Sequence, residues 1–183
     1  MGPLSLDEYR KRIVFPVINL YYEAGFDLEK ESYEAVCDEY IKNYIDNSAL
    51  IQIQKDGAEV LEKFRQQGVK QHIVSASGRD ILIDQVQNNG LFSYFTHILG
   101  QENNQAESKA HLAQKLVELT DCDPKEVLFI GDTVHDYEVA SESGFDCRLV
   151  ANGHCNRERL EATGVPVHEN LTELFEALRV TGG

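Results

Sequence analysis

A fully apolar run, Val127 to Ile130, is the feature that most restricts the fold of this chain. Strands that read as continuous apolar runs are typical of parallel sheets, because helices cover both faces of such a sheet. Helical segments separate this run from other short β-rich segments, at residues 71–76, 96–100, 147–151 and 165–168. Strands and helices that alternate in this way predict an α/β fold with a parallel sheet.

The first fifty residues read differently from the rest of the chain. From Ser5 to about Leu50 the pattern is helical and aromatic, with a stripe at helical spacing formed by Val36, Cys37, Tyr40, Ile41 and Tyr44. Packing between helices is the favoured interpretation of this stripe. Substrate contact is the alternative for a few residues of the region, among them Arg10, Tyr21 and Tyr22. We therefore separate a helical region, residues 1–52, from an α/β region, residues 53–183.

The composition limits the classes of partner. The chain has 183 residues, of which 42% are hydrophobic, enough for one globular domain or for one domain with a small insert. Its 17 basic and 31 acidic residues give a net charge of −14, which argues against binding to nucleic acid or to an anionic membrane. No apolar run approaches the length of a membrane span, and the N-terminal segment lacks the apolar stretch of a signal peptide.

The four cysteines form no CxxC pair, which is typical of a reduced, cytoplasmic protein. His154 and Cys155, eight residues after Cys147, could suggest a metal corner. No second pair of ligands has zinc-like spacing, so we do not predict a zinc site there.

Polar residues follow the predicted strands at the positions where binding sites form in open parallel sheets, the carboxyl ends. The segment from Ser75 to Arg79 follows the first β-rich run, and Lys109 stands at the start of a later helix. Gly131 and Asp132 follow the apolar run directly, and Asp136 comes one helical turn later. These positions are the candidates for a functional site.

Each candidate has a chemical interpretation. Two carboxylates at one strand end suit Mg²⁺, a hard cation that takes few carboxylates and keeps several waters. The hydroxyl of Ser75, beside the free N–H groups of a helix start, could bind phosphate oxygens. Lys109 opposes the dipole of its own helix, so a nearby anion would explain its position.

Each residue also has an interpretation without function. Asp132 or Thr133 could cap the following helix, Ser77 could cap the helix that begins near Arg79, and Lys109 could point at solvent. Taken singly, these alternatives are at least as good as the functional ones. Serine, lysine and paired aspartates at successive strand ends, in that order, are a much rarer coincidence.

That order resembles the haloacid dehalogenase-type phosphohydrolases. Their second motif is an apolar strand ending in Ser or Thr, their third is a Lys at a helix start, and their fourth is GDxxxD. These motifs match Ser75, Lys109, and Asp132 with Asp136. The resemblance covers nearly the whole chain and is most specific in GDTVHDYEVASESGFDC, while the later GHCNRERLEATG fits the phosphoglycolate-phosphatase-like branch.

The resemblance implies a Rossmann-like core over residues 53–183, with residues 1–52 as a helical cap. It also implies Mg²⁺-dependent hydrolysis of a small phosphorylated metabolite. Mg²⁺ would be held by Asp132 and Asp136, and catalysis would involve Ser75 and Lys109. The residues expected to bind the substrate are Ser75, Ala76, Lys109 and Arg79.

The first motif of the family, an apolar strand running into DxDGT, is not found in this sequence. In the family, its first Asp attacks phosphorus to form an aspartyl-phosphate, and its second acts as general acid and base. The Asp-x-Asp of this chain, Asp121 and Asp123, lacks a preceding strand and is rejected as the nucleophile. A shortened chain, a misplaced start codon or true degeneration would each give this pattern. We therefore expect absent or impaired turnover.

In the family, the strand of the first motif is central in the sheet, between the strand that ends at Ser75 and the strand that ends at Gly131. Without it, two interior strand edges are left unpaired, which favours aggregation. We expect the edges to pair directly, with another segment, or with a second chain in a homo-oligomer.

We consider three alternative functions for this chain. The first is a Mg²⁺-dependent phosphatase, and the second is a non-catalytic phosphate- and metal-binding or regulatory module that uses the same residues. The third is a receiver-like fold, which also holds Mg²⁺ with paired acids. It is disfavoured because receivers place their acids early in the chain and carry no cap of this size.

Overall fold

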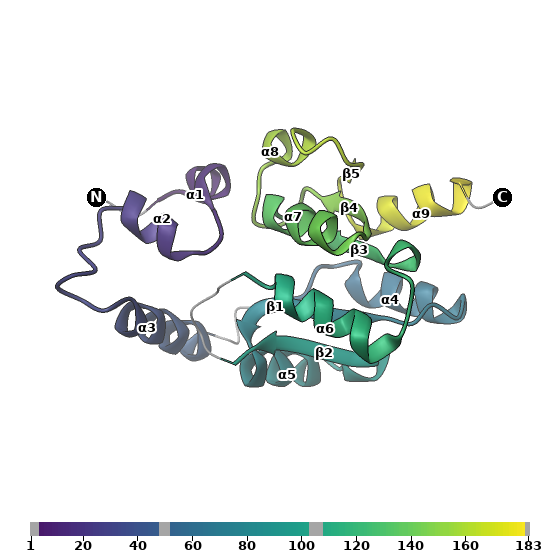
Figure 1. The fold of residues 1–183 in the computed structure, drawn as a ribbon, viewed down its shortest axis with the longest axis horizontal. Helices are drawn as coiled ribbons and strands as arrows, with labels where there is room; N and C mark the ends of the chain where they lie inside the picture. The colour runs from purple at the N-terminus through teal and green to yellow at the C-terminus, as the bar shows by residue number, and fades with distance from the viewer. Residues whose placement is uncertain (1–3, 48–51, 103–107, 182–183) are drawn as a thin grey trace. The chain divides into compact units, whose positions relative to one another are not determined.

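A computed structural model describes residues 4–47, 52–102 and 108–181 (Figure 1). The chain divides into two compact units. The first unit is formed by residues 15–109, and the second combines residues 2–14 with residues 110–183. The N-terminal helix therefore belongs to the same unit as the C-terminal half of the chain. The predicted cap boundary at residue 52 stays a prediction.

The first unit is built around a parallel pair of strands. Its helices are α2 (Ile18–Glu23), α3 (Tyr33–Asp46), α4 (Gly57–Gln66), α5 (Arg79–Asn88) and the 3-10 turn η2 (Phe92–Tyr94), and its strands are β1 (His72–Gly78) and β2 (His97–Gln101). Helix α5 links the two strands and packs against both. Helix α4 begins after Asp56 and ends before Gly68, whose φ of +75° favours glycine.

The second unit contains a three-stranded parallel sheet in the order β3-β4-β5. Its strands are β3 (Leu128–Gly131), β4 (Asp146–Val150) and β5 (Val167–His168), and its helices are α1 (Leu6–Arg12), α6 (Ala110–Thr120), α7 (Val134–Ser143), α8 (Arg157–Glu161), α9 (Leu171–Thr181) and the 3-10 turn η3 (Pro124–Glu126). Helix α7 packs against β3 and β4, and α9 packs against β4 and β5. The prediction of an α/β fold with parallel strands is confirmed.

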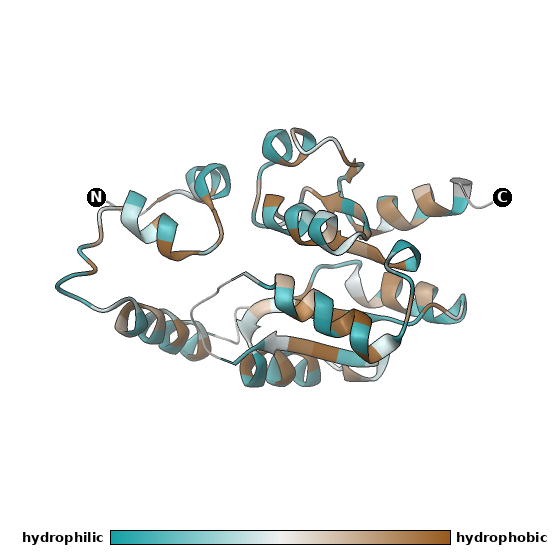
Figure 2. Ribbon diagram, in the orientation of Figure 1, coloured by the Kyte–Doolittle hydropathy of each residue, from teal (hydrophilic) through white to brown (hydrophobic). Residues whose placement is uncertain are grey.

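Apolar residues on the inner faces of the helices and strands form the core of each unit. In the second unit the most completely buried side chains include those of Val139, Leu149, Leu160 and Leu174. In the first unit, Val60, Leu82 and Val86 are buried. Figure 2 shows the resulting alternation of polar and apolar colour along α5, α6 and α7. Burial of these apolar side chains is the main force that holds the helices on the strands.

Strands β1 and β3 each lie at the end of their sheet. Over the described ranges, β1 pairs with β2 alone and β3 pairs with β4 alone. Each therefore keeps one edge without a strand partner among those residues, and how the edges are covered stays a prediction. Within the same ranges, no helix combines the length and apolar character needed to cross a bilayer.

Candidate functional site

The carboxyl end of β1 departs from regular pairing at the predicted phosphate-binding residues. Val74 pairs with Leu99, and the next paired residue of β1 is Gly78. The three residues Ser75–Ser77 therefore stand opposite Gly100 of β2. A bulge of this kind bends a strand and re-aims its side chains. The sequence predicts the end of this strand near Ala76, whereas pairing resumes at Gly78.

Gly100 allows the bulge to pack closely on β2. A Cβ atom at Gly100 would lie 2.8 Å from the Cα of Arg79 and 2.8 Å from the carbonyl oxygen of Ser77. The Ser75 hydroxyl oxygen accepts a hydrogen bond from the Ser77 amide at 3.1 Å. Because that bond uses the oxygen as an acceptor, the hydroxyl hydrogen can still be donated to an anion.

The substrate-binding candidates around the bulge differ in exposure. Ser75 and Ala76 are half-buried, whereas Arg79, the first residue of α5, is exposed. Ser77 does not cap α5, because the N-cap position is Gly78 and no side-chain cap is formed. The bulge is instead held by the bond from the Ser77 amide to Ser75, so Ser75 organises the turn on which it lies.

Lys109 reaches the end of β1. It immediately precedes α6, as predicted, and its Nζ donates a long hydrogen bond, 3.4 Å, to the carbonyl oxygen of Val74. Val74 is the residue before Ser75, so the ammonium group and the serine belong to the same strand end. The first unit thus brings together a fixed positive charge and a hydroxyl, two groups that can bind a phosphoryl oxygen.

The carboxylate of Asp136 organises the carboxyl end of β3. The side chain is 2% exposed, and its Oδ2 accepts three hydrogen bonds: from the Asp132 amide at 3.0 Å, the Thr133 amide at 2.9 Å and the Thr133 hydroxyl at 2.6 Å. Thr133 is the N-cap of α7 and forms a capping box with Asp136. The capping role considered for Thr133 is therefore present, and Asp132 stays outside it.

Gly131 is required by the position of Asp136. A Cβ atom at Gly131 would lie 2.2 Å from the Cβ and the Cγ of Asp136, far inside contact distance. The carboxyl group is thus packed directly on the main chain at the end of β3. This contact explains why a glycine ends the apolar strand and why an Asp stands five residues after it.

Asp132 is held from the other side by a loop that the sequence analysis did not assign to the site. The His154 amide donates to Asp132 Oδ2 at 2.7 Å, and the Cys155 amide donates to the Asp132 carbonyl oxygen at 3.1 Å. A Cβ atom at Gly153 would lie 1.9 Å from Asp132 Oδ2. The loop at residues 153–156 therefore packs on the first acid of the pair.

The rule used for β1 and β3 could have found this loop. Residues 153–156 follow the carboxyl end of β4, which pairs in parallel with β3, so the ends of both strands meet at the same edge. The polar residues after β4 carry part of the family resemblance, although they are not among the predicted site residues.

The donor set at the end of β3 fits Mg²⁺. Asp132 and Asp136 each have one carboxylate oxygen anchored by the protein, and both are hard oxygen ligands. Over the described residues, no group of three or more His, Cys, Asp or Glu side chains could hold a metal. Two carboxylates without a complete protein cage are typical of Mg²⁺ sites, in which water and substrate phosphate complete the coordination. They do not suit structural zinc, which needs four protein ligands.

Two polar residues near the paired acids, Cys155 and His135, have environments that do not require a metal. Cys155 is 1% exposed, and burial raises the pKa of its thiol, which keeps the sulfur protonated and argues against a metal corner. His135 Nδ1 lies 3.1 Å from Oε2 of Glu138 on the same helix.

Asp123 lies at the wrong end of β3 for phosphoryl transfer. It is the N-cap of η3, and its Oδ1 accepts the Lys125 amide at 3.0 Å. This turn precedes β3, whereas Asp132 follows it, so the two acids are at opposite ends of the strand. The geometry supports the rejection of Asp123 as a nucleophile.

In parallel α/β folds, ligands bind at the carboxyl ends of the strands, where this chain places a serine, a lysine and paired aspartates. Comparison with protein families makes the class specific: the model described as haloacid dehalogenase-like hydrolase matches residues 1–150. The chain belongs to this family, and the family resemblance noted in its motifs is confirmed. No curated protein matches the chain.

Solved structures of the family share the fold. A haloacid dehalogenase-like protein from Streptococcus pneumoniae is 17% identical, with a TM-score of 0.80, and the match covers 97% of this chain and 83% of that chain. A predicted phosphatase from Clostridium acetobutylicum is 16% identical, with a TM-score of 0.75, and the match covers 88% of this chain and 75% of that chain. A predicted phosphoglycolate phosphatase from Haemophilus somnus is 17% identical, with a TM-score of 0.67, and the match covers 74% of this chain and 61% of that chain. At these identities the likeness concerns the fold alone.

Proposed function

We propose that this chain binds a small phosphomonoester together with Mg²⁺. In this proposal, Ser75, the adjoining Ala76 and Lys109 bind the phosphoryl group, and Asp132 and Asp136 hold the metal. Arg79, at the start of α5, contributes positive charge to the substrate from an exposed position. Family membership supports the class of ligand, and the residues present support the assignment of each role.

The observation that carries the proposal is the anchoring of the paired carboxylates. Asp136 is fixed by three donors from its own turn, and Asp132 is fixed by the His154 amide. Carboxylates oriented in this way lose little further freedom when a cation binds, which favours binding. When bound, Mg²⁺ would offset the negative charge of a phosphoryl group.

The remaining residues act on the phosphoryl oxygens. The Lys109 ammonium supplies positive charge, and the Ser75 hydroxyl can donate a hydrogen bond, so together they orient the phosphoryl group at the end of β1. Orientation and charge stabilisation do not by themselves break a phosphate ester, because the family reaction also needs an attacking carboxylate.

We propose that turnover by these 183 residues is absent or impaired, because the sequence contains no DxDGT motif. The alternative is a module that binds phosphate and metal without catalysis. The two functions share the same residues and differ only in the chemical step. Binding and turnover must therefore be measured separately.

The test is Mg²⁺-dependent hydrolysis of a generic aryl phosphate, run beside calorimetric titrations with Mg²⁺ and with inorganic phosphate. Phosphoglycolate is the first natural ester to assay, since part of the sequence resembles that branch. Asp132→Ala should abolish Mg²⁺ binding, whereas Glu142→Gln, which removes an exposed acid of α7, should not. Binding without turnover would support the non-catalytic module. The absence of both kinds of binding would contradict the proposal.

We further propose a cytoplasmic protein that forms a homo-oligomer. The cysteines, Cys37, Cys122, Cys147 and Cys155, are all free thiols, which suits a reducing compartment. The edges of β1 and β3 that have no strand partner among the described residues are surfaces through which a second chain could pair. Sedimentation of the purified chain as a monomer at all concentrations would contradict the oligomer.

A further inference from the structure

The N-terminal helix holds the loop that orients Asp132. Arg10, near the end of α1, donates from its Nε to the carbonyl oxygen of Gly153 at 2.9 Å in a partly buried contact. The carbonyl oxygen of Arg10 accepts the Asn156 amide at 3.3 Å and an Arg159 guanidinium N–H at 3.2 Å. One residue of α1 thus contacts both ends of the loop at residues 153–156.

The neighbouring Tyr9 holds the middle of the same loop. Its hydroxyl oxygen lies 2.9 Å from Nδ1 of His154, and the two rings meet edge to face with centroids 5.9 Å apart. The backbone amide of His154 is the group that donates to Asp132 Oδ2. A continuous series of contacts therefore runs from Tyr9 through His154 to the carboxylate.

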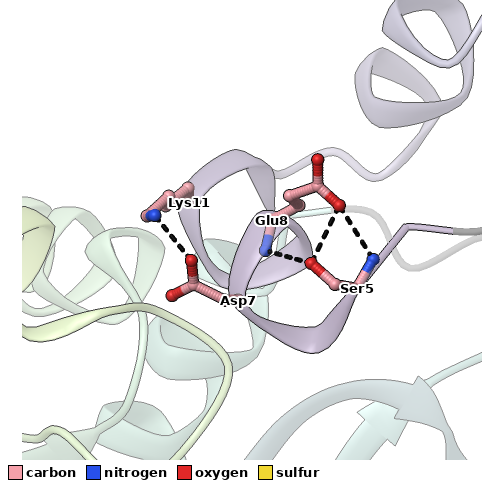
Figure 3. A network of polar contacts seen from close by, with 4 residues as sticks. All are labelled: Ser5, Asp7, Glu8 and Lys11. Atoms are coloured by element: carbon pink, nitrogen blue, oxygen red, sulfur yellow. Dashed lines mark hydrogen bonds and ion pairs between the residues drawn. The ribbon is translucent and has the colours of Figure 1, made fainter.

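Other residues of α1 and its N-cap make polar contacts within the helix. Figure 3 shows Ser5 and Glu8 in a reciprocal capping box and Lys11 paired with Asp7 at 2.6 Å. A seven-residue helix is marginal in isolation, so the capping box helps to keep it formed. Tyr9 and Arg10 are left to make the contacts with the loop.

We propose that Arg10 and Tyr9 are positioning residues for the metal site: they fix the loop at residues 153–156 against Asp132 and thereby set the direction of its carboxylate. The inference rests on the proposed function of Asp132 as a Mg²⁺ ligand. Groups that orient a ligand through one intermediate contact commonly change metal affinity by about tenfold or more. Loss of either side chain therefore weakens Mg²⁺ binding without removing a ligand.

The experiment measures two properties of the full chain. Amide hydrogen exchange of His154, followed by NMR without metal, reports the bond to Asp132, and calorimetric titration with Mg²⁺ alone reports affinity. In Arg10→Ala and Tyr9→Phe we expect exchange at His154 to rise about fivefold, the effect of losing roughly one hydrogen bond. We expect the Mg²⁺ dissociation constant to rise about three- to tenfold. The matched control is Lys11→Ala, which removes the exposed pair with Asp7 and a weaker electrostatic attraction to Glu158 of α8, and which should leave both values unchanged.

The outcomes separate the inference from the proposed function. Unchanged exchange at His154 in both variants overturns the inference. A lower melting temperature with unchanged exchange and unchanged Mg²⁺ affinity also overturns it, because the two side chains would then contribute only to the packing of the fold. If Arg10→Ala fails to fold, Tyr9→Phe, which keeps the ring and removes only the hydroxyl, decides the question. If the unmodified chain binds no Mg²⁺, the proposed function fails. Exchange at His154 still decides whether α1 positions the loop.

Discussion

The Asp136 carboxylate accepts the backbone N–H of Asp132 at 3.0 Å, so the second acid of the pair holds the main chain of the first. The two carboxylates are therefore not equivalent. Asp136 is buried and bonded to its own turn, whereas Asp132 is half-buried and held through one oxygen by the loop after β4. Asp136 organises the turn at the end of β3, and Asp132 carries the more accessible carboxylate.

This difference predicts that the two acids contribute unequally to stability although both are needed for Mg²⁺ binding. Asp136→Ala leaves a partly buried amide, a buried amide and a buried hydroxyl without their acceptor, so we expect a loss of about 2–4 kcal/mol in the free energy of unfolding, together with loss of Mg²⁺ binding. Asp132→Ala should also abolish Mg²⁺ binding but cost less than about 1 kcal/mol. Urea denaturation and calorimetric titration measure the two quantities. Equal stability losses would show that Asp136 has no special structural role.

Gly153→Ala tests the close approach of the loop to Asp132. The new methyl group would lie 1.9 Å from Asp132 Oδ2, so the loop or the carboxylate must move. We expect Mg²⁺ affinity to fall by about tenfold or more and stability to fall by about 1–3 kcal/mol. Gly57→Ala is the control, because a Cβ there makes an ordinary contact of 3.8 Å. If both variants bind Mg²⁺ normally, the loop does not orient the acid.

The strand ends could be predicted because their signals are local. The apolar run before Gly131 indicated a buried strand, and the carboxyl-end rule then pointed to Asp132 and Ser75. The loop at residues 153–156 and its contact with Arg10 were not predicted as part of the site. The bond from Arg10 to Gly153 joins residues 143 positions apart, and no periodicity or motif reports a contact over that distance. The bulge in β1 likewise depends on the neighbouring strand, because Gly100 leaves room for it.

Removing the positive charge at the end of β1 should weaken phosphate binding. In Lys109→Met we expect the dissociation constant for inorganic phosphate to rise about 10- to 100-fold, the range for losing a hydrogen bond to a charged group. Lys115→Met removes an exposed lysine of α6 and serves as the control. Calorimetric titration at low ionic strength measures both variants, since screening by salt would reduce the difference. An equal effect of the two substitutions would show that only net charge matters.

A stacked histidine pair predicts that stability falls in mild acid. His72 of β1 and His97 of β2 are register partners whose rings stack with centroids 5.2 Å apart. Burial lowers the pKa of His72, and the charges of His97 and Lys70 lower it further. The unfolded chain, whose histidines titrate near pH 6.5, therefore takes up this proton before the folded protein does. The contribution of His72 to stability is complete above about pH 6.5 and is lost as the pH falls toward the lower folded pKa.

Urea midpoints measured between about pH 7.5 and 5 test this linkage. The unmodified chain should lose stability as the pH falls, and His72→Gln should flatten part of that decline. It will not remove all of it, because burial also lowers the pKa of His168. His111→Gln, at an exposed position of α6, is the control and should keep the original slope. An unchanged slope in His72→Gln would show that the stacked pair does not govern the acid sensitivity of the fold.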